Sequence, residues 1–406
     1  MPLSIRSFQS DNGERFAVLV DETGMPPYYP ALYVTAILRG ASLAVNTIRA
    51  ALTAIKVLQT WQDYSHIDLE SRFKRSELLL DHEIHSLRDF MQEPLATAGR
   101  RAGKITSIKR RPKTVSTKSQ YNRMTIAAEY LGFLAGRLQP VSKTSSSATA
   151  SMVARIKANR PKISSKSNID RDEEYLDDEV LDAIEEALKP GVGSYSTTDL
   201  GLQMRNALMF TILRLVGVRR GELLNLKIGD FDFGKNTMSI VRRPDSESDS
   251  RAYQPVAKTR QSTVPLMPEL MHQVHEYILK HRRKIPAAQR HGYLFVSHAG
   301  KTKGSPLSNA AFGKFIGEIS KVAAEFSGIH AHALRHHWNY SFSIRGDASG
   351  ISPEREAKLR SYLMGWSETS GTAATYNRRH IKEEAGKAVL GMQNRYLAKE
   401  DKGSQQ

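Results

Sequence analysis

Two long stretches of this chain contain no acidic residue, and they limit where its globular domains can lie. The first runs between Glu93 and Glu129, and the second spans 140–169. The second begins with the serine-rich run PVSKTSSSATAS, which is typical of a flexible linker. Composition then reverses at Asp170, where DRDEEYLDDEV places acids at the start of a helix, as the helix dipole favours. We therefore expect a helical domain over 31–139, a basic flexible linker over 140–171, a second domain over 172–395 and a tail over 396–406.

The first acid-free stretch concentrates positive charge. It holds nine Lys or Arg residues, which phosphate groups of a partner would attract. A solvated loop is the alternative, but the length of the stretch favours phosphate contact. The nine residues are Arg100, Arg101, Lys104, Lys109, Arg110, Arg111, Lys113, Lys118 and Arg123.

The overall charge and the missing residue types narrow the function classes. The net charge is +17, which indicates a polyanionic partner such as nucleic acid, with a merely basic surface as the alternative. The chain has no cysteine, which excludes disulfides, thiolate nucleophiles and cysteine-based zinc sites. No apolar run approaches the roughly 18–20 residues of a membrane span. The N-terminus lacks the apolar segment of a signal peptide, so a cytoplasmic protein is expected.

The periodicity of apolar residues predicts a mainly α fold with a small antiparallel β-sheet. Ile48, Leu52 and Ile55 recur at helical spacing, as do apolar residues through most of the first domain. Strands are expected in two places only. Within 1–30, RFAVLVD and the turn ETG indicate a short strand pair with PPYYP as an extended exit; in the second domain, TMSIVRR and STVPL indicate a small sheet.

The first of four short motifs in the second domain is LVGVRRGELLNL, at 215–226. Gly217 is expected to end one helix and Arg219 to open the next. Glu222 follows three residues after Arg219, hence on the same helical face, where its carboxylate can orient the guanidinium. An ordinary surface ion pair is the alternative.

The second motif is VAKTRQSTVPL, at 256–266. It puts Lys258 near a hairpin turn between two strands, from which a lysine can reach into a DNA groove. One more surface lysine is the alternative. The segment 243–255 lengthens this hairpin loop, so Lys235 is the second candidate for the same role.

The third motif is HALRHHWNYSF, at 332–342. In a helix, His332 and Arg335 share one face and can together grip a phosphate and move a proton. His332 and His336 are four residues apart, like two metal ligands. Zinc is nevertheless disfavoured, because the chain has neither HExxH nor cysteine.

The fourth motif is LMGWSETSGTAATYNRRH, at 363–380, in which Tyr376 follows Trp366 by ten residues. The preceding SETSGT segment would let the Tyr376 hydroxyl swing into an attacking position, whereas a half-buried core tyrosine is the alternative. Two other tyrosines lie nearby. Tyr340 points about 140° away from Arg335 on the same helix, and Tyr362 is expected in the core.

Taken in order, the motifs resemble the signature of the tyrosine recombinases, also called phage integrases: Arg, Lys, His-x-x-Arg, His or Trp, then Tyr. GVRRGEL, AKTRQSTVPL, HALRH and MGWSETSGTAATY are similar to its four segments. The resemblance covers about 172–395, while 31–139 is similar only in style to the family's core-binding domain. The matching residues are Arg219, Lys258, His332, Arg335, Trp366 and Tyr376, with Glu222 in support.

The resemblance implies a site-specific DNA recombinase, an integrase of mobile elements, that closes two domains around DNA. Tyr376 would attack a phosphate to give a 3′-phosphotyrosyl bond, and strands would exchange through a Holliday junction. Arg219 and Arg335 would hold the non-bridging oxygens, His332 would help to deprotonate the tyrosine, and Lys258 would protonate the leaving oxygen. Trp366 would pack against the phosphate.

The resemblance also implies the partners. They are double-stranded DNA with specific attachment sites and three further copies of the chain in a homotetramer, in the bacterial cytoplasm at the nucleoid. No cofactor, metal or ATP is expected, because the arginines and lysine supply the charge and no GxxxxGK[ST] loop occurs. A type IB topoisomerase and a catalytically silent DNA-binding relative are the alternatives; the HxLRH and GW…Y motifs favour the recombinase.

After the tyrosine, Ala385, Ala388, Val389 and Met392 repeat at helical spacing. Such an apolar stripe must be buried somewhere. We expect this C-terminal helix to dock on a neighbouring protomer, with packing against its own domain as the alternative.

Overall fold

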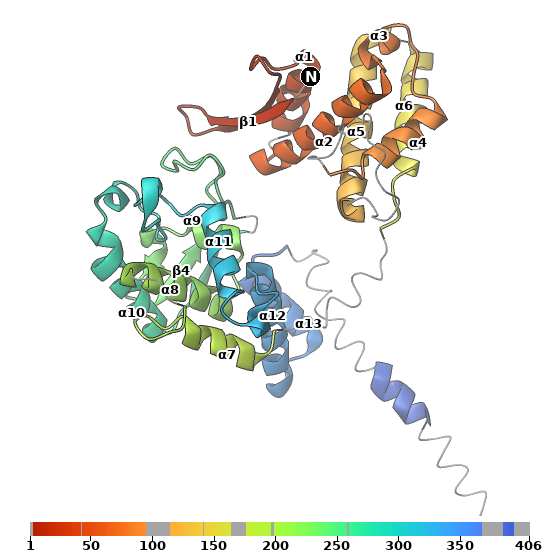
Figure 1. The fold of residues 1–406 in the computed structure, drawn as a ribbon. Helices are drawn as coiled ribbons and strands as arrows, with labels where there is room; N and C mark the ends of the chain where they lie inside the picture. The colour runs from red at the N-terminus through yellow and green to blue at the C-terminus, as the bar shows by residue number, and fades with distance from the viewer. Residues whose placement is uncertain are drawn as a thin grey trace, which may run out of the picture. The chain divides into compact units, whose positions relative to one another are not determined.

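The computed structural model describes residues 3–41, 43–94, 114–140, 142–163, 176–195, 199–257, 260–367 and 385–393. The chain divides into two compact units, Met1–Ser167 and Asn168–Gln406 (Figure 1), and the division falls inside the expected linker range. The expected fold class is confirmed, since both units are mainly helical and each contains one small antiparallel sheet.

Unit 1 begins with the expected strand pair. β1 (Ser4–Gln9) pairs antiparallel with β2 (Arg15–Val20). The helices that follow are α1 (Tyr28–Tyr33), the π-helix η1 (Val34–Arg39), α2 (Val45–Ser65), α3 (Leu69–Lys74), α4 (Asp81–Phe90), α5 (Thr117–Leu138) and α6 (Lys143–Ala158). Apolar residues of α2 are completely buried, among them Ile48, Leu52 and Trp61, so the helical spacing in the sequence marks the core of this unit.

The expected extended exit at PPYYP is wrong. Pro27 is the N-cap of α1, and the helix starts at Tyr28. Pro30 lies in its first turn, where the missing amide hydrogen costs no helical hydrogen bond. A proline-rich run therefore opens a helix here instead of continuing the strand.

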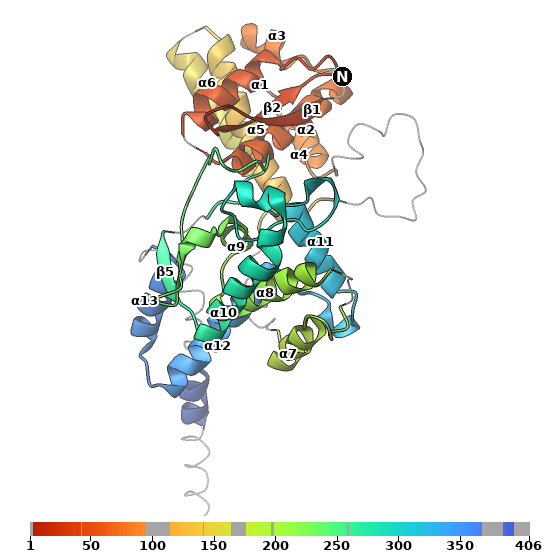
Figure 2. The same cartoon turned by 90° about the vertical axis from the view of Figure 1, so that its left-hand side faces the viewer.

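The expected linker is also corrected over most of its length, because Lys143–Ala158 forms the helix α6. Ser142 caps it by accepting a hydrogen bond from the Ser145 amide. Met152 and Ile156 are fully buried, and α6 lies alongside α5 in both views (Figures 1 and 2). Two apolar residues four positions apart thus provide the serine-rich segment with a core contact that its composition concealed.

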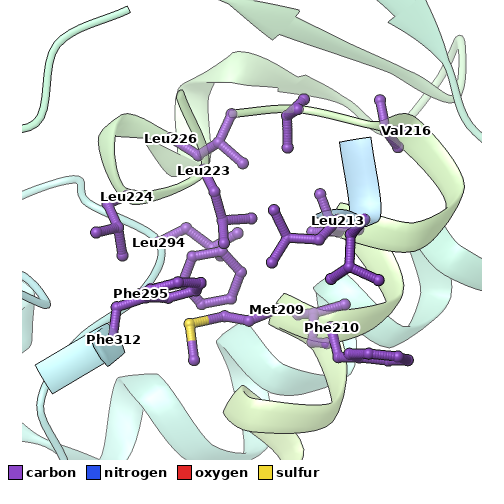
Figure 3. Close-up of a cluster of buried hydrophobic side chains, with 14 of the residues drawn as sticks. Met209, Phe210, Leu213, Val216, Leu223, Leu224, Leu226, Leu294, Phe295 and Phe312 are labelled. Carbon is purple, nitrogen blue, oxygen red and sulfur yellow. The ribbon is translucent and has the colours of Figure 1, made fainter. Parts of the chain in front are cut away.

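Unit 2 is built around α8 (Leu200–Val216), more than half of whose residues are buried. Figure 3 shows Met209 of this helix pointing toward Phe295, in the same buried cluster as Leu213 and as Leu223 of the next helix. The other helices of this unit are α7 (Asp178–Ala187), α9 (Arg220–Asn225), α10 (Pro268–Glu276), the π-helix η5 (Tyr277–His281), α11 (Asn309–Ile319), α12 (Ala331–Ala348) and α13 (Pro353–Leu363). Five 3-10 turns occur in its described part: η4 (Ile228–Asp230), η6 (Arg282–Lys284), η7 (Pro286–Arg290), η8 (Gly300–Thr302) and η9 (Ala324–Phe326).

The expected strands TMSIVRR and STVPL are confirmed as a sheet of order β3-β4-β5. Its strands are β3 (Phe231–Asp232), β4 (Thr237–Ile240) and β5 (Ser262–Pro265). The long connection from β4 to β5 folds back on the unit, because buried Arg251 pairs with Asp249 and donates to the carbonyls of Leu224 and Leu307 at 3.0 and 2.8 Å.

Residues 385–393 form a helix, as expected, and every one of them is exposed. Across the part of the chain that the structure describes, no helix combines the length and apolar character that a membrane crossing requires.

Candidate active site

Arg219 and Glu222 lie at the turn between α8 and α9. Gly217 ends α8 in the left-handed conformation, with φ +65°, and Arg219 is the N-cap of α9. The Glu222 carboxylate accepts the Arg219 backbone N–H at 2.8 Å and its guanidinium N–H at 3.1 Å. The Glu222 side chain is only 2% exposed, whereas that of Arg219 is 31% exposed. The carboxylate therefore orients an arginine that still reaches solvent.

Arg335 comes from α12 and meets the same carboxylate. Its Nη1 lies 3.7 Å from Glu222 Oε2 and donates to the Gly217 carbonyl at 2.7 Å. Its Nη2 lies 3.5 Å from the Met364 carbonyl. The Arg335 side chain is 4% exposed. Two guanidinium groups thus share one buried carboxylate, which leaves a net positive charge suited to an anion such as phosphate.

Trp338, one turn after Arg335 on α12, holds the α8–α9 turn in place. Its Nε1–H donates to the Leu215 carbonyl at 2.9 Å. Its ring covers Gly217 so closely that a Cβ there would lie 2.7 Å from the ring. Two features therefore require glycine at position 217: the positive φ and the closeness of the Trp338 ring. No periodic signal in the sequence indicates this role of Trp338.

Three histidines gather at the start of α12. His330 is the N-cap and accepts the Ala333 N–H through Nδ1. The His332 and His336 rings meet edge to face with centroids 4.2 Å apart. Although His332 reaches the surface, its pKa is lowered to about 4, first by lost hydration and then by His336, His330, Arg335 and Arg219. His332 is therefore neutral at pH 7 and able to accept a proton.

Trp366 follows α13 and completes the described part of the site. Its side chain is buried with Met364, and the Arg335 guanidinium carbon lies 5.5 Å from the ring centroid. Buried Asn339 connects the two elements, since its amide donates to the Arg335 carbonyl at 2.7 Å and approaches Met364 Sδ at 3.8 Å. Asn339 is a second supporting residue that the sequence did not reveal.

The remaining candidates fall outside this cluster or outside the described residues. Tyr376 and Lys258 are not among the described residues, nor are the basic residues from Arg100 to Lys113. Lys118 is exposed on α5. Arg123, by contrast, donates to the carbonyls of Met91 and Glu93 at 3.0 and 2.7 Å, which are structural contacts within unit 1.

Two other candidates can be placed. Lys235, the second candidate for the hairpin lysine, is 80% exposed and lies 3.8 Å from Asp232. The expectation that Tyr362 belongs to the core is wrong, because this residue is 73% exposed at the end of α13. Among the described residues, no group of three or more His, Asp or Glu is arranged to hold a metal ion.

Known proteins share this architecture. The model of the phage integrase family matches residues 174–382. The structure of the XerH site-specific recombinase bound to its difH substrate superimposes with a TM-score of 0.51 at 17% identity, over 90% of this chain and 85% of that one. The Tn1549 transposon integrase in complex with transposon right-end DNA gives 0.48 at 14% identity, over 88% and 99% of the two chains. No curated protein matches the chain. Because the family model covers more than half of its residues, the chain belongs to the phage integrase family, the tyrosine recombinases.

Proposed function

We propose that this chain is a site-specific DNA recombinase that cleaves and rejoins strands through a 3′-phosphotyrosyl intermediate, with Tyr376 as nucleophile. The observation that supports it most is the pair of arginines on one buried carboxylate. Arg219 and Arg335 come from α9 and α12, and Glu222 lies 3.1 Å from the first and 3.7 Å from the second. Guanidinium groups fixed in advance stabilise the charge that develops on a phosphate in the transition state.

The reaction exchanges one phosphate ester for another. The Tyr376 oxygen attacks phosphorus, the bond to the 5′ oxygen breaks, and that oxygen leaves as a hydroxyl after receiving a proton. His332, neutral because its pKa is lowered to about 4, accepts the tyrosine proton. Since the phosphotyrosyl bond conserves the ester energy, rejoining needs no nucleotide. The exchanged strands of two duplexes then form a Holliday junction, held by four copies of the chain.

Lys258 is the preferred general acid because its neighbours in the chain touch both halves of the site. The Val256 carbonyl lies against Gly221, two residues after Arg219, where a Cβ would be 3.0 Å from the oxygen. The Arg260 N–H donates at 3.1 Å to the carbonyl of Gly365, the residue before Trp366. Lys235 lies in a different turn and next to Asp232, so it has no comparable anchoring.

Double-stranded DNA is the proposed substrate, and both units would bind it. The basic residues from Arg100 to Lys118 would contact its phosphates, with Arg123 left out because its guanidinium is engaged inside unit 1. Such contacts fix position but read no sequence.

Trapping with a nicked substrate tests this function. A duplex that carries a candidate attachment site is nicked so that the short 5′-hydroxyl fragment diffuses away after cleavage. The chain should then accumulate a covalent adduct at the 3′ phosphate, with EDTA present. Absence of an adduct on every attachment site tested, together with intact DNA binding, would favour a silent relative. Relaxation of supercoiled plasmid without any specific site would favour a topoisomerase.

A further inference from the structure

The segment from Tyr277 to Gly317, within unit 2, contains no acidic residue and eight Lys or Arg residues. The combination of no acidic residue with eight basic residues concentrates positive charge in this segment. Unlike the first acid-free stretch, all of this one is described, and buried residues such as Tyr293 and Phe295 anchor it in the unit. It follows α10 and includes η6, η7, η8 and most of α11 (Figure 1).

Seven basic side chains of this stretch are exposed. Lys280 pairs with Glu276, and Lys314 lies on α11. The other five lie in and around the turns η6 to η8: Arg283, Lys284, Arg290, Lys301 and Lys303. We call these five the η6–η8 basic surface. Within the part of the chain that the structure describes, none of the five forms an ion pair with a carboxylate. Exposed lysines elsewhere in the unit do, as in the pairs Lys189–Glu186 and Lys321–Glu318. The charge of the η6–η8 basic surface is therefore not neutralised by its own fold.

A buried arginine holds the first part of this surface in a fixed shape. Arg282 is 4% exposed, and its guanidinium donates to the carbonyls of Tyr293, Ala288 and His291 at 2.8, 2.8 and 2.7 Å. These three bonds close the loop that presents Arg283, Lys284 and Arg290. A loop fixed in this way loses little conformational entropy when its charges bind a partner.

A histidine joins the second part of the surface to the first. His291 Nε2 lies 2.8 Å from the Gly304 carbonyl, and its Nδ1 lies 3.2 Å from the Tyr293 backbone nitrogen. Because the Gly304 carbonyl can only accept and the Tyr293 N–H donates to Nδ1, the ring is assigned as neutral with its proton on Nε2. The η8 turn, which presents Lys301 and Lys303, also packs on the loop directly, since a Cβ on Gly304 would lie 2.6 Å from Ala287. The two loops that carry the five charges are thus held against each other.

We propose that the η6–η8 basic surface binds the phosphate backbone of duplex DNA, at phosphates other than the one that is cleaved. The inference rests on the proposed function only in its choice of DNA as the polyanion. A duplex fits better than a single strand, because single-strand sites stack bases on exposed aromatic rings. The aromatic residues of this stretch, by contrast, are all buried: Tyr277, Tyr293, Phe295, Phe312 and Phe315. The surface therefore adds affinity without reading sequence.

Matched charge removals test the proposal in the full chain. The variant K301Q/K303Q removes two charges from the surface, and the control K189Q/K321Q removes two that are paired with acids. Binding to a duplex is measured across a salt series. We expect the surface variant to lower the slope of log affinity against log salt by about 0.9 for each phosphate that it no longer neutralises, on every sequence. The control should keep the parental slope. Equal slopes for the surface variant and its parent, or an equal fall in both variants, would overturn the proposal.

Two further readouts separate this proposal from the proposed function. At saturating nicked duplex, the surface variant should form covalent adduct at the parental rate, because neither lysine forms an ion pair or hydrogen bond with Arg219, Glu222 or Arg335 in the described structure. If neither the parent nor the variant forms an adduct but the slope still falls in the variant, the result supports DNA binding by the surface and contradicts the proposed cleavage function. An equal loss of affinity for a single strand of the same charge would overturn the duplex assignment.

Discussion

The carboxylate of Glu222 lies 3.7 Å from the guanidinium of Arg335, although the two residues come from different helices. The same carboxylate accepts two hydrogen bonds from Arg219. Glu222 is therefore the element that sets the relative position of the two arginines. If the site binds phosphate as proposed, the precision of its grip depends on this one buried side chain.

Replacing Glu222 with Gln should lower both the stability of the fold and the rate of cleavage. The glutamine side chain lacks the charge that both arginines face. Its NH2 group would also lie against the N–H groups of the arginines, which cannot accept a hydrogen bond. Breaking a buried charge pair costs roughly 3–5 kcal/mol of unfolding free energy. Cleavage at saturating DNA should also slow, by up to about 10²-fold, the lower end of what loss of a direct donor costs. Thermal unfolding and single-turnover cleavage measure the two effects.

The matched control is Glu318→Gln, which removes an exposed acid paired with Lys321. Surface pairs contribute about 0–1 kcal/mol, so this variant should match its parent in both measurements. Parental cleavage by Glu222→Gln would mean that the arginines need no shared carboxylate.

Gly217→Ala should destabilise unit 2 by two separable causes. A positive φ costs a non-glycine residue about 1–2 kcal/mol, and the new methyl group would also meet the Trp338 ring, 2.7 Å away. The ring contribution disappears in a Trp338→Ala background. In a double-mutant cycle by chemical denaturation, the double variant should therefore lose less stability than the sum of the losses in the two single variants. Strict additivity would mean that the backbone alone accounts for the loss.

The histidine cluster should make stability depend on pH. Because the folded pKa of His332 is about 4, below the ordinary value of 6.5, the unfolded chain binds more protons between these values. His332 therefore costs nothing above pH 6.5 and destabilises the folded state progressively as the pH falls toward 4. His332→Gln should lose less stability than its parent over this window. His298, whose pKa is also lowered to about 4, is retained in both chains and cancels in the difference. Parallel stability curves for the two chains would contradict the lowered pKa.

Truncation after Glu383 should remove assembly but keep DNA binding. Val389, Leu390 and Met392, on the helix that would be removed, are 51%, 60% and 64% exposed. Exposed apolar residues in a helix are typical of a surface for a partner, which we expect to be a second copy of the chain. Sedimentation of the DNA complex should then give single protomers on each half-site. Intact tetramers from the truncated chain would count against docking in trans.

Local features of the site were predictable because they depend on spacing within one helix. Arg219 and Glu222 are three positions apart, as are His332 and Arg335, so each pair shares a helical face. The contact of Glu222 with Arg335 was not predictable from spacing, since it depends on how α9 and α12 pack. The same is true of the Trp338 ring against Gly217. Tertiary packing places these groups, and no periodic pattern in the sequence encodes it.

The errors in the fold also have physical causes. Composition predicted a linker at the serine-rich segment, but burial of Met152 and Ile156 outweighs the low helix propensity of the serines. Tyr362 looked apolar enough for the core, yet it faces solvent because α13 buries Glu356 and Arg360 as an ion pair instead. In both cases the decisive contact lies outside the local sequence.

The identity of the nucleophile is the central claim, and single Tyr-to-Phe variants on nicked attachment-site DNA test it most directly. Tyr340→Phe and Tyr362→Phe serve as controls, one half-buried in α12 and the other exposed on α13. We predict that Tyr376→Phe binds the site with parental affinity and forms no covalent adduct, while both controls form it. A covalent adduct from Tyr376→Phe, mapped by peptide sequencing to another tyrosine, would contradict the account.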